Sequence, residues 1–193
     1  MLQVSIKKWV LAACLAAISY LLMFLSFAVI PIVPYMKIDF SDLAVLIGFF
    51  VLGTSGGIGV AAIRSVLYFV ITGVSLDNFI GVATSFIASL AFCLPLYFLL
   101  KNKQTLQIKN YALAIVVATL ILTVVLSLAN WLVITPVYIA VLGLNLGLPV
   151  AKLVLYGVIP FNLIKGVLVG SAFALVFSKL HGWLTIKATD FSN

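Results

Sequence analysis

The sequence predicts an all-α integral membrane protein with six transmembrane helices, a short second helix, and long first and fifth loops. Of its 193 residues, 65% are hydrophobic and only 8% are charged, whereas soluble domains are about half apolar and about one quarter charged. A chain of this length cannot bury so much apolar surface in its own interior. We therefore expect residues 1–193 to form one membrane domain, with lipid as its solvent and no soluble part.

Long charge-free stretches locate the spans, because a helix needs about 20 apolar residues to cross a bilayer. The first span is predicted at 9–30 and ends before the prolines at 31 and 34. A signal peptide is the alternative for this stretch, but its apolar run exceeds the usual length of about 7–15 residues. Further helices are expected at 43–52, 58–72, 78–100, 111–134 and 156–180.

The helix predicted at 43–52 is too short to cross about 30 Å of hydrocarbon at about 1.5 Å per residue. A glycine turn at 53–57 follows it, so we expect protein rather than lipid to shield this helix. The fifth span is predicted to end near Pro136, before a long outer loop that could include a short helix. The last span is predicted to begin beside Pro160, which a first helical turn tolerates.

Basic residues outnumber acidic residues by 11 to 4, which gives a net charge of +7. They lie in short clusters between apolar runs, which is typical of cytoplasmic loops rather than of a nucleic-acid-binding surface. With six spans and both termini in the cytoplasm, seven lysines lie inside and two lie outside. Those inside are Lys7, Lys8, Lys101, Lys103, Lys109, Lys179 and Lys187, and those outside are Lys37 and Lys152. This asymmetry predicts cytoplasmic termini.

The chain has few residues that could carry catalysis. It contains no glutamate, one histidine (His181), and two separated cysteines, Cys14 and Cys93, which we expect to be packing residues. One histidine cannot build a metal site, and no pair of aspartates lies within the predicted spans, so we expect no metal site and no enzymatic activity. The GxGxxA match at 57–62 lacks a βαβ context and is better interpreted as close helix packing. A GxxxxGK[ST] loop is also missing, so the chain cannot itself hydrolyse ATP by that means.

Two polar motifs stand out on the predicted outer side. The first, at 37–42, follows two prolines and could be either a solvated loop that caps the next helix or a lid over a pocket. The second, at 160–166, places Asn162 and Lys165 on one helix face. An ionisable residue within a span is costly and usually faces a cavity or a partner. We therefore favour a polar site over a lysine that extends to the membrane surface.

Three other residues allow two interpretations each. Trp131 suits either the aromatic belt at the membrane surface or a pocket wall. Its neighbour Asn130 suits either a bond between helices or the same pocket. Arg64 is equally compatible with a lipid-facing side chain and with an ion pair inside the bundle.

Alanines in the first span form two faces of small residues. One face consists of Ala12 and Ala16, and the next consists of Ala13 and Ala17. This spacing lets another helix approach closely, either within the same bundle or from a partner subunit.

Together these features resemble the substrate-binding components of energy-coupling-factor (ECF) vitamin transporters, specifically the riboflavin-binding subfamily. The resemblance extends over nearly the whole chain, and its most specific motifs are 37–43 and 160–166. It implies a bacterial cell-membrane protein that captures riboflavin from outside and needs no cofactor. It also implies delivery through a transmembrane coupling subunit powered by two separate ATPase subunits.

The resemblance further implies a set of functional residues. Ligand contacts are expected from the first outer loop, which would close over the pocket, and from polar residues within spans. The expected ligand-binding residues are Lys37, Asp39, Phe40, Ser41, Asp42, Asn130, Asn162 and Lys165, and those expected to dock the coupling subunit are Ala12, Ala13, Ala16 and Ala17. Arg64 is assigned no ligand contact.

A component for another vitamin, such as thiamin or biotin, is the main alternative. A charged ligand would require more compensating charge in the pocket. Riboflavin is flat and uncharged, and it suits a largely apolar pocket with a few amide and ammonium groups.

Overall fold

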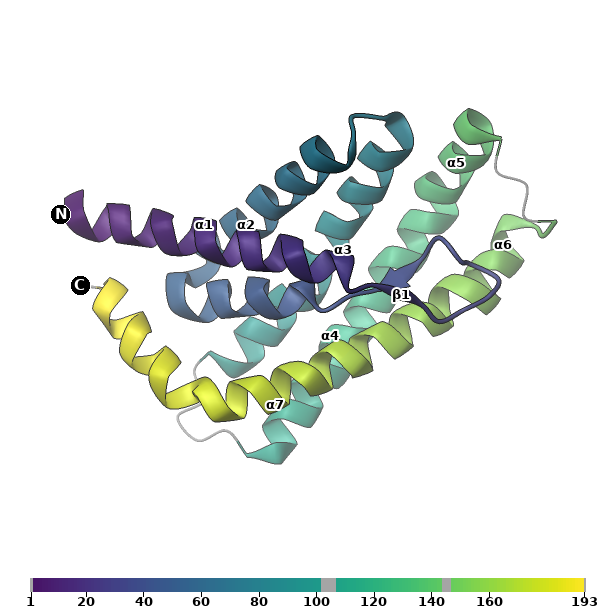
Figure 1. Cartoon of the computed structure of the whole chain (residues 1–193). Coiled ribbons are helices and arrows are strands. Elements are labelled where there is room, and N and C mark those ends of the chain that lie inside the picture. The colour runs from purple at the N-terminus through teal and green to yellow at the C-terminus, as the bar shows by residue number, and fades with distance from the viewer. Residues whose placement is uncertain (1, 102–106, 144–146, 193) are drawn as a thin grey trace.

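The computed structural model describes residues 2–101, 107–143 and 147–192, and it is almost entirely helical (Figure 1). For residues 2–5, 142 and 181–192 it describes the backbone alone, so the side chains of His181 and Lys187, and all of Lys103, lie outside the described residues. The elements are α1 (Leu2–Phe24), β1 (Phe27–Ala28), β2 (Lys37–Ile38), α2 (Ser41–Thr72), α3 (Leu76–Leu100), α4 (Ile108–Ala129), the π-helical segment η1 (Asn130–Ile134), α5 (Thr135–Leu142), α6 (Val150–Leu153), the π-helical segment η2 (Val154–Val158) and α7 (Ile159–Ser192).

The predicted membrane class is confirmed. Within the described residues, five helical stretches are long and apolar enough to cross a bilayer: Ile6–Phe24, Ser41–Thr72, Leu76–Leu100, Ile108–Val141 and Val150–Leu180. The second stretch contains both the second and the third predicted helices, so the count of six spans stays a prediction. The start of α1 and the end of α7 lie at the same end of the molecule (Figure 1).

Helix α2 consists of two halves, 41–52 and 54–72, joined by a kink at Gly53. The φ of 78° and ψ of −173° at Gly53 belong to a region that glycine adopts readily because it has no Cβ. The halves then fold back on each other, so that a Cβ atom on Gly48 would lie 3.0 Å from Cγ2 of Val60. The turn takes one residue instead of the predicted five, because residues 54–57 are already helical.

Two expected helix ends at prolines are wrong. Helix α4 continues through η1 into α5 and so passes Pro136. The last helical stretch begins with α6 at Val150, ten residues before Pro160. Proline has no N–H and its ring crowds the carbonyl four residues earlier, but a π-type segment precedes each of the two prolines. In these wider turns the N–H of Thr135 bonds to Asn130 O and that of Ile159 to Val154 O. The helices therefore continue, and most of the expected long fifth loop is helix.

The long first loop is present, and it lies at the end of the molecule away from the chain ends (Figure 1). It begins earlier than predicted, because α1 ends at Phe24. Within the loop, β1 and β2 pair antiparallel, with Phe27 opposite Ile38 and Ala28 opposite Lys37. This pairing folds the loop back toward the start of α2.

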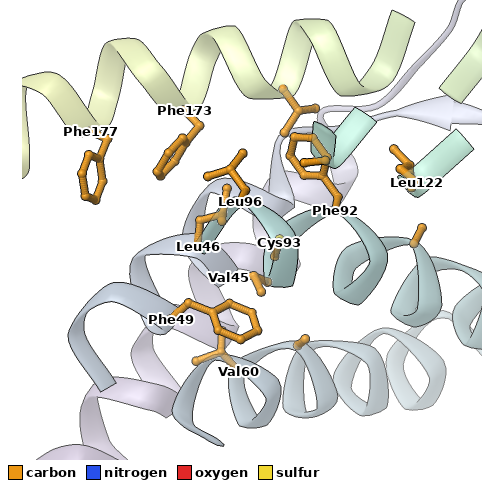
Figure 2. Packing of buried hydrophobic residues seen from close by; sticks show 14 of the residues in the cluster. Val45, Leu46, Phe49, Val60, Phe92, Cys93, Leu96, Leu122, Phe173 and Phe177 are labelled. Atoms are coloured by element: carbon orange, nitrogen blue, oxygen red, sulfur yellow. The ribbon is translucent and has the colours of Figure 1, made fainter. Parts of the chain in front are cut away.

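The apolar core lies between α2, α3, α4 and α7 (Figure 2). The first half of α2 is largely buried, as predicted for a helix shielded by protein. Cys93 is buried in this core, whereas Cys14 is exposed, and both thiols are free. The residues that Figure 2 labels in the core are Val45, Leu46, Phe49, Val60, Phe92, Cys93, Leu96, Leu122, Phe173 and Phe177.

Candidate ligand-binding site

A cavity of about 500 Å³ lies between the first loop and five helical regions. Its volume is in the range of about 300–1,000 Å³ that is usual for small-molecule sites. Its described polar lining residues are Ser26, Tyr35, Lys37, Asp39, Tyr68, Thr72, Ser75, Asp77, Asn78, Thr84, Ser85, Asn130, Tyr138, Asn162 and Lys165. The four charged residues in this set are two lysines and two aspartates, so their formal charges cancel.

The two π-helical segments place two asparagines on the cavity wall. Asn130 is the first residue of η1, and Asn162 lies four residues beyond the end of η2. Both are buried, and each donates its Nδ2 to a backbone carbonyl one turn earlier: Asn130 to Leu126 O at 2.8 Å, and Asn162 to Val158 O at 2.9 Å. These bonds orient each side chain on its own helix. Because an amide has two N–H donors and an oxygen acceptor, each asparagine can still form further hydrogen bonds with a ligand.

Lys165 and Asp42 form a buried ion pair beside these asparagines. Lys165 lines the cavity, and its Nζ lies 3.8 Å from Oδ2 of Asp42. The other oxygen of Asp42, Oδ1, accepts hydrogen bonds from Arg64 Nη1 at 3.2 Å and from the hydroxyl of Ser89. Arg64 is fully buried, so the structure selects the ion pair inside the bundle over the lipid-facing alternative. Arg64 and Lys165 therefore share one carboxylate, that of Asp42.

The first loop connects the cavity wall to this network through Asp39. Oδ1 of Asp39 accepts hydrogen bonds from the backbone N–H of Ser41, at 2.9 Å, and from its hydroxyl. The Ser41 hydroxyl in turn accepts from Arg64 Nη1 at 2.7 Å, and the Ser41 carbonyl accepts from Ser19 Oγ at 2.8 Å. The start of α2 is therefore tied to α1 and to the second half of α2 directly behind the wall.

The structure brings five of the eight expected ligand-binding residues to the cavity wall: Lys37, Asp39, Asn130, Asn162 and Lys165. The other three, Phe40, Ser41 and Asp42, lie behind the wall instead. Phe40 packs against the core, and Ser41 and Asp42 belong to the polar network around Arg64. Ser41 and Asp42 turn away because a helix begins at Ser41 and directs successive side chains around its axis.

Sequence reasoning missed the tyrosines of the wall. The rings of Tyr35 and Tyr138 lie 6.1 Å apart, and the Tyr138 hydroxyl donates to Asp77 O at 3.3 Å. Burial and the nearby Tyr138 raise the pKa of Tyr35 to about 12, so its phenol stays neutral near pH 7. Tyr138 fell in a segment expected to be a loop, which concealed its position. Trp131 is 53% exposed and absent from the described wall.

The two alanine faces of the first span differ in exposure. Ala12 and Ala16 are buried in the bundle core, whereas Ala13 and Ala17 are exposed. Because α1 packs mainly against α2, the first pair serves packing within the chain. Only the second pair is free to meet another helix.

Fold and cavity together define the class: a multi-pass helical membrane protein with a small-molecule-sized cavity between its helices. The chain belongs to the family of ECF transporter substrate-specific components, whose model matches residues 7–177. The predicted family is thus confirmed, and it is a family of transport proteins.

Similar proteins cover almost the whole chain. The riboflavin transporter FmnP of Bacillus subtilis is 35% identical over 93% of this chain and 94% of its own length. The riboflavin transporter RibU of Staphylococcus aureus is 31% identical over 92% of each chain. A solved structure described as the S component of a bacterial ECF transporter matches with a TM-score of 0.76 and 30% identity, covering 93% of this chain and 98% of the other.

Proposed function

We propose that this chain binds riboflavin as the substrate-specific component of an ECF-type transporter in the bacterial cell membrane. One observation carries the proposal: proteins named riboflavin transporters are similar to it over more than nine-tenths of its length, including 35% identity to FmnP over 93% of the chain. The alternative of another vitamin, such as thiamin or biotin, has no such support among these relatives.

The chemistry of the cavity also suits riboflavin. The isoalloxazine ring is flat, with apolar methyl groups at one end and carbonyl and imide groups at the other. Asn130 and Asn162 offer amide groups to the imide or to ribityl hydroxyls, and Lys165 offers N–H donors to a carbonyl. Tyrosine rings on the wall provide flat apolar contact.

The charge balance favours an uncharged ligand. Oδ2 of Asp42 lies 3.8 Å from the Lys165 ammonium. The formal charges of the two lysines and two aspartates among the described wall residues cancel. A ligand carboxylate, as in biotin, or a ligand cation, as in thiamin, would therefore enter without a free counter-charge, which is costly in a buried site. Riboflavin brings no charge.

Transport requires partners under this proposal. The cavity would open to the outside of the cell, and both termini would lie in the cytoplasm. The chain would dock a transmembrane coupling subunit that two ATPase subunits drive. The exposed face with Ala13 and Ala17 is the expected contact, because small residues allow close helix approach.

Absorbance of the purified protein tests the proposal directly. We expect protein from riboflavin-fed cells to carry a yellow chromophore, and ligand-free protein to quench the fluorescence of added riboflavin at a stoichiometry of about one. Thiamin and biotin serve as matched ligands in the same titration. Saturable binding of either one, without flavin binding, would overturn the assignment.

A further inference from the structure

The ammonium of Lys165 has a carboxylate on one side and the cavity on the other. Its side chain is only 9% exposed, and its Nζ lies 3.8 Å from Asp42 Oδ2. That separation exceeds the range of about 2.7–3.2 Å for a hydrogen bond. No hydrogen bond from this ammonium to a described residue is present, so its three N–H donors are available to a ligand in the cavity.

Asp42 is fixed from the opposite direction. Its Oδ1 accepts from Arg64 and Ser89, and Arg64 is in turn held by the hydroxyls of Ser41 and Ser89. These partners come from both halves of α2 and from α3. Oδ2, by contrast, is buried and has no hydrogen-bond partner among the described residues. The carboxylate therefore cannot rotate freely, and its unpaired oxygen is the one nearest Lys165.

We infer that Asp42 is the positioning residue for Lys165: it holds the ammonium at the cavity wall by charge without occupying the hydrogen bonds that the ligand uses. The inference rests on the proposed function, because the ligand it concerns is riboflavin. Lysine has a long flexible side chain, and ordering it only when the ligand arrives would weaken binding. A fixed charge behind the ammonium provides that order beforehand.

This arrangement also differs from a structural ion pair. A pair that serves only stability closes to hydrogen-bond distance and satisfies both partners. Here Oδ1 carries the structural bonds to Arg64 and Ser89, while Oδ2 has no hydrogen-bond partner among the described residues and faces the ammonium of Lys165, which lines the cavity. The two oxygens of one carboxylate therefore have separate roles.

A double-mutant cycle on riboflavin binding tests the inference. Lys165→Met removes the donor, and we expect the dissociation constant to rise about tenfold or more. Asp42→Asn keeps the shape but removes the charge, and we expect a rise of about tenfold as well. If Asp42 acts through Lys165, adding Asp42→Asn to Lys165→Met changes the constant by less than about twofold. If it acts only through packing, the two losses multiply, and the inference is overturned.

Two further variants keep the test decisive. Ser89→Ala removes one of the hydrogen bonds that fix Oδ1 but keeps the charge of Asp42, so it should raise the dissociation constant less than Asp42→Asn does, and by less than about twofold when Lys165→Met is already present. If Asp42→Asn does not purify folded because Arg64 is left unpaired, the same cycle is run with Arg64→Met in every variant. Wild-type protein that does not bind riboflavin refutes the proposed function, whereas wild-type binding with multiplying losses refutes the positioning role alone.

Discussion

Gly57 packs directly against the ring of Phe49: a Cβ atom at residue 57 would lie 2.2 Å from Cγ of that ring. The two residues lie on opposite sides of the kink at Gly53, so their contact holds the two halves of α2 together. This close approach buries the short first half against protein. It also places Asp42, near the start of that half, within reach of Arg64 in the other half.

Replacing Gly57 with alanine should therefore destabilise the fold. The added methyl group would overlap the ring of Phe49, and such overpacking costs about 1–3 kcal/mol. Thermal unfolding in detergent should show a lower midpoint. Gly59→Ala is the matched control, because a Cβ there meets nothing within 4 Å and alanine is the better helix former. Equal midpoints for the two variants would mean that the halves of α2 are packed less closely.

Asn162→Ala and Lys165→Ala should weaken riboflavin binding without unfolding the bundle. A hydrogen bond from a charged donor contributes about 1.5–3 kcal/mol, so losing the lysine should weaken affinity about 10–150-fold. Fluorescence quenching titrations of the purified variants measure this effect. Trp131→Ala, at an exposed position absent from the described wall, should bind normally. Normal affinity for Lys165→Ala would show that the ammonium does not contact the ligand.

Large residues on the exposed face of α1 should separate binding from transport. Ala13→Trp combined with Ala17→Trp should abolish uptake by cells and leave riboflavin binding intact, because the added bulk holds a partner helix away. Ala12→Trp combined with Ala16→Trp should lower both stability and binding, since these two residues are buried in the core. Normal uptake with tryptophan at 13 and 17 would contradict the docking role.

The orientation in the membrane is testable by cysteine labelling. After Cys14→Ala and Cys93→Ala, single cysteines replace the exposed residues Lys37 and Lys101. The basic asymmetry predicts that a membrane-impermeant maleimide reacts at position 37 in intact cells, and at position 101 only after permeabilisation. The reverse pattern would invert the proposed topology.

The sequence by itself determined the class of the protein and much of its wall chemistry. Apolar runs of sufficient length require lipid, whatever packs against them, and α3 at Leu76–Leu100 agrees with the predicted 78–100. The shared face of Asn162 and Lys165 follows from helical spacing alone, and both residues line the cavity. These are local properties, which depend on neighbours a few residues away.

Only the tertiary structure decided the rest. Whether a proline ends a helix depends on whether a wider turn can absorb it, as η1 and η2 do. Which alanine face is buried depends on the side from which α2 approaches α1. Arg64 could be assigned an ion pair only once Asp42, 22 residues away, was brought to 3.2 Å. Burial and charge pairing depend on contacts between distant segments, and these contacts are absent from the local pattern that a sequence displays.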